Sequence, residues 1–214
     1  MSAGNLQRQP ENCLSTPEPP ADGTTLPAPT HPRPPPGVGG WGQDGARTVL
    51  ESGRLLVSVR RTVKVLLLDE EDRLLLLRGR ESAGCEAIWY PVGGGIEDGE
   101  DAVAAGRREI LEETGRREVV IGPEVWHRRH LYSWRGKQTD TDERWFVART
   151  QHFTPTPYAL TAEEQTYVTG SRWWRAEDLA ATTDPVFPPD LGMHLASLLH
   201  NGFPATPINI SALG

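Results

Sequence analysis

Residues 94–116 read GGIEDGEDAVAAGRREILEETGR, and this stretch joins a glycine-rich loop to a helix with recognisable ends. Asp98 or Asp101 can cap a helix over residues 102–114, which contain no proline and mostly good helix formers. Gly115 stands where a helix C-terminus favours glycine. The stretch therefore predicts a loop that leads directly into a helix, and the rest of the fold is expected to be built around it.

Three glutamates of this predicted helix share one face. Glu109, Glu112 and Glu113 are spaced i, i+3 and i+4, which at about 100° per residue places them within an arc of roughly 100°. Carboxylate oxygens are the ligands that Mg²⁺ and Mn²⁺ prefer, and such metals neutralise phosphate charge and generate a nucleophile from water. A row of glutamates is more often a solvated helix face, so the spacing alone leaves both interpretations open.

Length and charge limit the partners. A chain of 214 residues can form one ordinary domain with an added tail, and its net charge of −7 argues against binding a nucleic-acid duplex or an anionic membrane. It contains no run of about 18 apolar residues and no export-type N-terminus, so we expect no membrane span. Cys13 and Cys85 have no metal-ligand spacing, and Cys13 lies in a segment expected to be mobile, so we expect no structural disulfide, which fits a reducing cytoplasm.

The chain divides into a tail, a domain and an extension. Residues 1–46 are rich in proline and glycine and lack a periodic apolar pattern, which predicts a disordered tail. Within it, the PRPPP segment is either a polyproline docking motif or an ordinary part of that tail. We expect the domain to span residues 47–205 and a C-terminal extension to span residues 206–214.

Apolar and β-branched runs predict several strands in the domain, separated by turns and a few helices. The expected strands cover residues 55–68, 73–78, 88–90, 118–121, 125–134, 143–150 and 167–175. An acidic turn at 69–72 and a polar hairpin loop at 135–142 connect two pairs of them. Further helices are expected at 176–181 and 188–201. One sheet system with a few helices packed against it predicts an α+β fold or an α/β/α sandwich.

The full set of residues around the helix is more specific than the glutamates alone. It occupies fixed offsets, which a chance match would reach about once in 10⁸ starting points: Gly94, then Glu100, Arg108, Glu109, Glu112, Glu113 and Gly115. This string resembles the Nudix box, Gly-x5-Glu-x7-Arg-Glu-U-x-Glu-Glu-x-Gly-U, in which U is a bulky apolar residue. Arg116 departs from the last position of the box, and Trp89-Tyr90-Pro91 departs from the Trp-x-x-Pro often found before it.

The resemblance implies an α/β/α sandwich with a mixed sheet, in which the box forms a loop–helix–loop motif. It also implies hydrolysis, with Mg²⁺ or Mn²⁺, of a nucleoside diphosphate linked to another moiety. Glu112 and Glu113 match the metal-ligand positions of the family, and Glu109 matches a position that ligates metal or orients the attacking water. Arg108 matches the bracing arginine, and Glu100 matches its partner.

The resemblance does not fix the general base, because the base varies within the family. Glu109 is one candidate. Glu163 or Glu164 is another, although these two residues can equally cap a short helix.

The residues that would bind the substrate are less specific. Gly94 and Gly95 match the loop beside the metal site. Trp89 and Tyr132 can stack on a base, although aromatic residues in strands more often belong to a core. Arg128, with Arg129 and His130, forms a basic cluster in the sequence that either meets phosphates or is a surface feature.

The main alternative is a Nudix-like domain that binds a nucleotide without hydrolysing it. Such domains commonly lose box glutamates, and all of the box glutamates are present in this sequence. The residues around Trp173, Trp174 and the VFPPDL segment resemble the C-terminal part of bacterial Nudix proteins, which favours a bacterial cytoplasmic enzyme. A homodimer is common in the family, and no residue of the sequence identifies an interface.

Overall fold

The structure is a computed structural model, and the residues that it describes belong to one compact unit, Val38–Gly214. Its described backbone comprises residues 49–51, 54–56, 59–80, 85–134, 137–157 and 167–211. The predicted tail at 1–46 and the two base candidates Glu163 and Glu164 lie outside these residues. None of the helices in the described part of the chain is long and apolar enough to cross a membrane.

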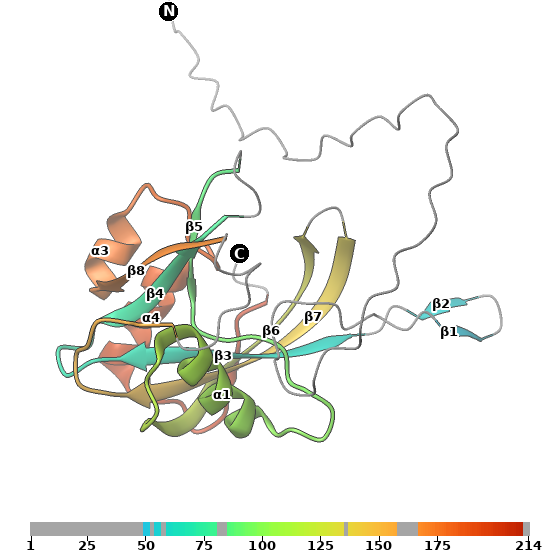
Figure 1. The fold of residues 1–214 in the computed structure, drawn as a ribbon, viewed down its shortest axis with the longest axis horizontal. Helices are drawn as coiled ribbons and strands as arrows, with labels where there is room; N and C mark the ends of the chain where they lie inside the picture. Colours follow the sequence, from blue (N-terminus) through green and yellow to red (C-terminus); the bar gives the residue numbers. More distant parts are fainter. Residues whose placement is uncertain are drawn as a thin grey trace, which may run out of the picture. The chain divides into compact units, whose positions relative to one another are not determined.

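The described chain forms a mixed β-sheet with helices on both faces (Figure 1). Its strands are β1 (Val49–Glu51), β2 (Arg54–Leu56), β3 (Arg60–Leu68), β4 (Leu74–Gly79), β5 (Ile88–Pro91), β6 (Val120–Trp134), β7 (Lys137–Arg149), β8 (Val168–Trp174) and β9 (Ile208–Asn209). Its helices are α1 (Ala102–Thr114), α3 (Ala176–Ala181) and α4 (Leu191–Asn201).

The strand order in the main sheet is β5-β4-β3-β7-β6-β9, with β8 paired to β4, while β1 and β2 form a separate antiparallel pair. Strands β3 and β7 are parallel, as are β6 and β9, and the other pairs in the main sheet are antiparallel. The sheet is therefore mixed.

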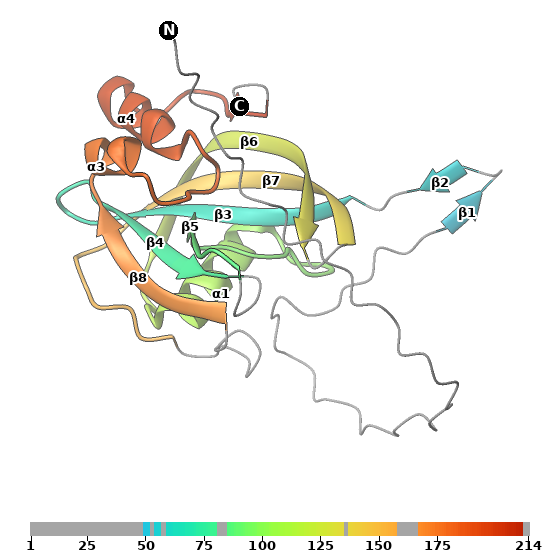
Figure 2. The ribbon, with the colours of Figure 1, turned by 90° about the horizontal axis from the view of Figure 1, so that it is seen from above.

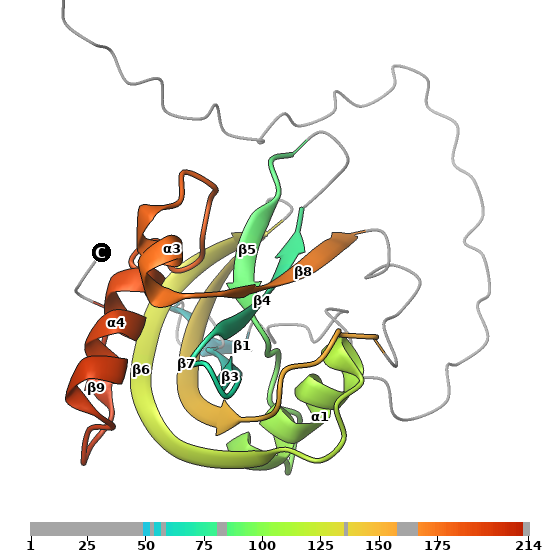
Figure 3. The same cartoon turned by 90° about the vertical axis from the view of Figure 1, so that its left-hand side faces the viewer.

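Alternation along β3 assigns side chains to the two faces of the sheet. Val63 and Val65 belong to the apolar cluster that includes residues of α1, whereas Leu66 and Leu68 belong to the cluster that includes residues of α3 and α4. Two views show α1 on one side of the sheet and the α3–α4 pair on the other (Figures 2 and 3). The predicted α/β/α sandwich is confirmed.

Helix α1 occupies the residues that the sequence predicted. Asp101 caps its N-terminus, because the Oδ1 atom accepts a hydrogen bond from the backbone N–H of Ala104 at 2.8 Å. Gly115 ends the helix in the left-handed conformation, with φ of 74°, and its N–H donates to the carbonyl of Leu111. Local sequence signals thus set both ends of this element.

Several strand predictions were wrong in their boundaries. The segments 118–121 and 125–134 merge into the single strand β6, whose pairing with β7 is irregular around Glu124. The expected loop at 135–142 is mostly strand, because β7 already begins at Lys137. Cross-strand ion pairs, such as that between Arg129 and Asp140, allow these polar residues to extend the hairpin.

Differences also occur at other element boundaries. The strand expected at 55–68 is divided, with β3 beginning only at Arg60, and α4 begins at Leu191 instead of residue 188. Strand β9 was not expected. It pairs in parallel with β6, and the following Ile210 is buried in the cluster on the α3–α4 face.

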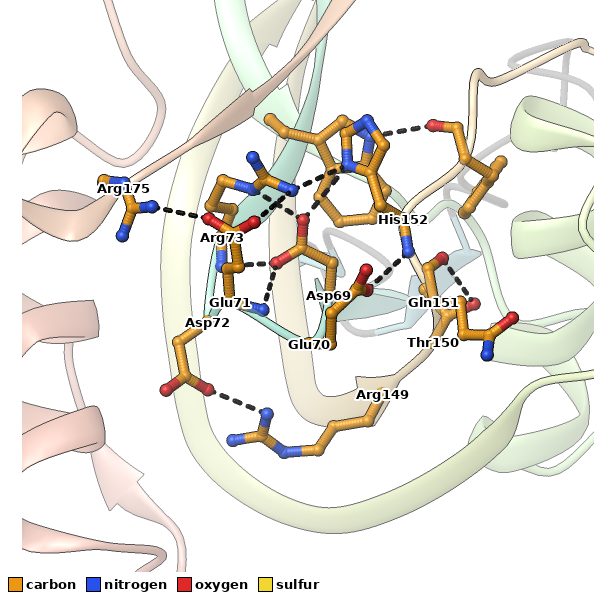
Figure 4. A network of polar contacts seen from close by, with 12 residues as sticks. Asp69, Glu70, Glu71, Asp72, Arg73, Arg149, Thr150, Gln151, His152 and Arg175 are labelled. Carbon is orange, nitrogen blue, oxygen red and sulfur yellow. Dashed lines mark hydrogen bonds and ion pairs between the residues drawn. The ribbon is translucent and has the colours of Figure 1, made fainter.

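The acidic turn between β3 and β4 connects three parts of the fold (Figure 4). The buried carboxylate of Asp69 accepts hydrogen bonds from the backbone N–H groups of Glu71 and Arg73 and from the Arg73 Nε atom, and it lies 3.1 Å from His152 Nδ1. The other acidic residues of the turn also have partners. Glu70 accepts a hydrogen bond from the backbone N–H of His152. Glu71 accepts one from Arg175, and Asp72 forms an ion pair with Arg149. The turn therefore ties the segments after β7 and β8 to the β3–β4 connection.

Candidate active site

The glycine loop is attached to the edge of β3. The N–H groups of Val63 and Val65 each donate at 2.9 Å to the carbonyls of Gly94 and Val92, and Ile96 donates back to Arg61. Between these bonds, Gly93 has φ of +141°, and a Cβ atom on it would lie 2.1 Å from the Val63 carbonyl oxygen. Only glycine fits at this position, and the loop consequently enters α1 with a fixed geometry.

Arg108 braces the acidic face of α1 from its centre. Its Nη2 atom donates to the carbonyl of Gly95 at 2.8 Å and to Glu100 at 3.0 Å. Its Nη1 atom donates to Glu109 at 2.8 Å and to Glu112 at 3.2 Å. One guanidinium thus links the loop to three carboxylates.

Glu109 has a strongly perturbed pKa. It is only 4% exposed, and burial raises its pKa to about 7 against the opposing effect of the Arg108 charge. The carboxylate lies directly against the loop, because a Cβ atom on Gly94 would be 2.3 Å from Glu109 Oε1. Gly94 therefore provides the space that this carboxylate occupies.

The third glutamate of the helix face bonds to the loop as well. Glu113 is buried, and its Oε2 atom accepts a hydrogen bond from the N–H of Gly93 at 2.9 Å. Glu112 is half-buried beside Arg108. Within the described residues, no three acidic, histidine or cysteine side chains converge into a ready metal shell.

The donor set nevertheless fits a hard divalent cation. Glu109, Glu112 and Glu113 supply carboxylate oxygens from one helix face, which is the ligand chemistry that Mg²⁺ and Mn²⁺ require. In addition, the buried Glu109 carboxylate lies in a space beside the loop that a single Cβ atom would fill. These residues are therefore the ones that could hold a metal.

Sequence reasoning missed a buried charged group on the opposite face of the sheet. Lys64 lies in the middle of β3 and is 7% exposed, and Glu143 on the neighbouring β7 is 3% exposed. Glu143 Oε2 accepts a hydrogen bond from Trp145 Nε1 at 3.2 Å and lies 3.6 Å from Arg128 Nη1. The available signal was a single lysine inside an otherwise apolar strand, VKVLLL.

The basic cluster expected from the sequence is divided by strand alternation. Arg128 and His130 both contact Phe187, with the Arg128 guanidinium 4.6 Å from the ring centroid. Arg129 instead forms an exposed ion pair with Asp140. Burial, together with the charges of Arg128 and Lys64, lowers the pKa of His130 to about 4, so His130 is neutral at pH 7.

Of the two predicted stacking residues, Trp89 does not lie at the acidic face. Trp89 is 8% exposed in the cluster on the α3–α4 face, where its Nε1 atom donates to Asp184 and its ring packs edge-on against Trp174. Tyr132 lies opposite Thr139 in the β6–β7 ladder, and its side chain is outside the described part of the chain.

Comparison with known proteins gives consistent matches. The family profile for the NUDIX domain matches residues 58–192. A protein named RNA pyrophosphohydrolase from Roseobacter denitrificans is 30% identical over 59% of this chain and 82% of its own length. Another of that name, from Bradyrhizobium diazoefficiens, is 32% identical over 42% of this chain and 60% of its own length.

Solved structures agree on the fold. A MutT protein from Methanosarcina mazei superposes with a TM-score of 0.54 at 16% identity, covering 69% of this chain and 98% of its own. A NUDIX hydrolase from Nitrosomonas europaea gives 0.50 at 23% identity, covering 69% and 94%. The profile match, the relative from Roseobacter and the shared fold show that this chain belongs to the Nudix hydrolase family.

Proposed function

We propose that this protein is a pyrophosphohydrolase that depends on Mg²⁺ or Mn²⁺ and cleaves a nucleoside diphosphate linked to another moiety. Membership of the Nudix family makes it a hydrolase of pyrophosphate bonds. The observation that carries the finer proposal is the acidic face of α1, where Glu109, Glu112 and Glu113 lie beside the glycine loop and Arg108 braces two of them. The complete carboxylate set argues against a purely nucleotide-binding domain.

Each residue of the face has a proposed role. Glu109, Glu112 and Glu113 would hold the cation, which when bound neutralises phosphate charge and polarises the scissile linkage. Arg108 and Glu100 keep the carboxylates and the Gly95 carbonyl in register. Gly94 leaves room for the Glu109 carboxylate, and we propose that the backbone of Gly94 and Gly95 borders the bound substrate beside the metal.

We propose that Glu109 also removes the proton from the attacking water. Its pKa of about 7 is suited to a general base near neutral pH. In the reaction, the water oxygen bonds to phosphorus, the bridging P–O bond breaks, and the proton passes to a carboxylate oxygen of Glu109. The products are two phosphorylated fragments, one of them a nucleotide. Glu163 and Glu164 remain alternative bases.

The proposed substrate is a soluble nucleotide derivative or the 5′ end of an RNA strand. The second possibility is included because the relatives from Roseobacter and Bradyrhizobium are named RNA pyrophosphohydrolases. Arg128, whose guanidinium lies over the Phe187 ring and 3.6 Å from Glu143, is a candidate for phosphate binding. We further propose a cytoplasmic, bacterial setting, since these relatives are bacterial, and a homodimer as the assembly to test.

The test is a substrate panel with product identification. Full-length protein is incubated with Mg²⁺ or Mn²⁺ and with a dinucleoside polyphosphate, ADP-ribose, NADH, nucleoside triphosphates and a 5′-triphosphorylated RNA. We expect at least one to be cleaved at a pyrophosphate bond. Glu112→Gln and Glu113→Gln are expected to lower kcat by at least about 100-fold, equivalent to roughly 3 kcal/mol of lost transition-state stabilisation.

Glu118→Gln is the matched control, because Glu118 is an exposed glutamate just beyond α1 and is expected to leave kcat unchanged. Chelation of the metal should abolish turnover by the wild-type protein, and added Mn²⁺ should restore it. Turnover that survives both α1 substitutions would show that the acidic face is not the metal site.

A further inference from the structure

The peptide groups of Gly93 leave the ladder that attaches the loop to β3. Val92 and Gly94 on either side accept hydrogen bonds from Val65 and Val63, whereas Gly93 is skipped. Its two polar groups are bonded to side chains instead. The Gly93 N–H donates to Glu113 Oε2 at 2.9 Å, and the Gly93 carbonyl accepts from Lys64 Nζ at 3.3 Å, with both bonds buried.

These two side chains lie on opposite faces of the sheet. Glu113 belongs to α1, which packs on the face that includes Val63 and Val65. Lys64 alternates with those valines and therefore projects from the α3–α4 face. The Gly93 residue thus forms a bridge through the edge of the sheet, from a buried lysine to a buried glutamate of the candidate metal site.

The buried lysine has a countercharge on its own face. Glu143 on β7 is 3% exposed, and the Lys64 charge counteracts the rise in the pKa of Glu143 that burial causes. Glu143 is itself positioned by Trp145 and Arg128. Charged side chains buried this deeply contribute little net stability compared with apolar residues of similar size, so the presence of Lys64 in an otherwise apolar strand requires another explanation.

We propose that Lys64 is a positioning residue for the hydrolysis, acting through Gly93 on Glu113. Its ammonium group fixes the orientation of the Gly93 carbonyl, and this aims the Gly93 N–H at Glu113 and restricts that carboxylate to one arrangement. Glu143 places a buried negative charge on the same face of the sheet. Lys64 itself does not contact the substrate. For its kinetic part, this inference rests on the proposed function.

The experiment is a double-mutant cycle in the full-length protein. Lys64→Met, Glu113→Gln and the double variant are compared with wild type for their urea midpoints and for kcat and KM on the best panel substrate. Lys64→Met is expected to lower kcat about 10- to 100-fold, the range for residues that orient a metal ligand, with KM changed less than about twofold. Because Lys64 acts through Glu113, the double variant should be no slower than Glu113→Gln alone.

Two further variants separate positioning from folding. Lys64→Met/Glu143→Gln removes the buried charges together, so it should keep a urea midpoint near that of wild type and still show the loss in kcat. Arg129→Met removes a cation from an exposed ion pair on β6, two strands away from Lys64, and should change neither measurement. A merely structural role for Lys64 would instead give a loss of activity that parallels the loss of stability.

The outcomes distinguish this inference from the proposed function. If the wild type cleaves nothing in the panel, the proposed function fails, but the urea midpoints still test the bridge. In that cycle, the change in urea midpoint for the Lys64→Met, Glu113→Gln double variant should be smaller than the sum of the changes for the two single variants. Additive shifts in midpoint, or multiplicative losses in kcat, would overturn the role of Lys64.

Discussion

At the scale of single residues, the contact between Gly94 and Glu109 leaves no space for a side chain at position 94. A Cβ atom on Gly94 would lie 2.3 Å from one carboxylate oxygen of Glu109, and Arg108 prevents that carboxylate from moving freely. We predict that Gly94→Ala lowers kcat about 100-fold, because a displacement of about 1 Å at a reacting group can have an effect of this size. Steady-state kinetics on the best panel substrate measure the change.

Gly170→Ala is the matched control for this prediction. Gly170 lies in β8, and a Cβ atom there would meet no atom within 4 Å. The control should change the free energy of unfolding by less than about 0.5 kcal/mol and leave kcat unaltered. If Gly94→Ala retained full activity, the reaction would not depend on the present position of the Glu109 carboxylate, and the prediction would be wrong.

The roles of individual residues were predictable from sequence only where the motif was local. Residues of the box are close in the chain, so helix periodicity placed Glu109, Glu112 and Glu113 on one face correctly. The cluster of Arg128, Arg129 and His130 was divided because adjacent residues in a strand point to opposite faces. Lys64 was overlooked because its partners come from the glycine loop and from β7.

At the scale of elements, the β3–β4 turn should carry a measurable pH dependence of stability. Burial alone would raise the pKa of Asp69, but hydrogen bonds from Arg73, Glu71 and His152 outweigh it and leave the pKa lowered. The charged form therefore stabilises the fold above the unfolded-state pKa of about 3.9, and this contribution is lost as pH falls through the lower folded-state value.

Asp69→Asn tests this contribution. At pH 7 the variant should lose roughly 2 to 3 kcal/mol in the free energy of unfolding, the typical effect of hydrogen bonds to a buried charged group. Below about pH 4 the difference from wild type should shrink, because Asp69 itself becomes protonated. Urea unfolding at several pH values measures both effects.

Asp72→Asn serves as the control for the turn. Asp72 pairs with Arg149, and both side chains are about half exposed, so its loss should change stability by less than about 1 kcal/mol. A difference between wild type and Asp69→Asn that persisted unchanged at low pH would assign the effect of Asp69 to packing and not to its charge.

Element boundaries were predictable to the extent that they depend on local signals. Helix α1 has a side-chain cap at Asp101 and a glycine at its end, and both were predictable from the sequence. Strand β9 was not, because its two residues have no alternating pattern and are ordered by pairing with β6. The β6–β7 hairpin extended beyond expectation for a similar reason, since cross-strand ion pairs replace an apolar face there.

At the scale of the whole molecule, the two faces of the sheet carry different groups of residues. The α1 face carries the acidic residues and the glycine loop. The α3–α4 face carries Trp89, Trp126, Trp145 and Trp174, together with the buried Lys64 and Glu143. The hydrogen bonds of Gly93 to Lys64 and to Glu113 connect the two faces. Apolar clusters pack against both faces of β3 and hold the strand in place. The glycine loop is hydrogen-bonded to this strand and leads directly into α1, so β3 positions both.

The outer edge of this sheet yields a final prediction, which concerns the domain boundaries. Ile210 is 5% exposed, and its N–H donates to His127 on β6 at 2.9 Å. Deleting residues 206–214 removes this contact along with β9, and burial of one such side chain is worth about 1.5 to 3 kcal/mol. We predict a fall in Tm of roughly 5 to 10 °C, measured by differential scanning calorimetry.

Deletion of residues 1–46 is the comparison for this truncation, because we expect it to leave both Tm and kcat unchanged. Removal of 206–214 should therefore lower Tm, whereas removal of 1–46 should not, although both segments were predicted from the sequence to lie outside the domain. An unchanged Tm after removal of 206–214 would support the predicted domain boundary at residue 205. A fall in Tm with kcat preserved at low temperature would show that β9 closes the sheet edge without taking part in the chemistry on the α1 face.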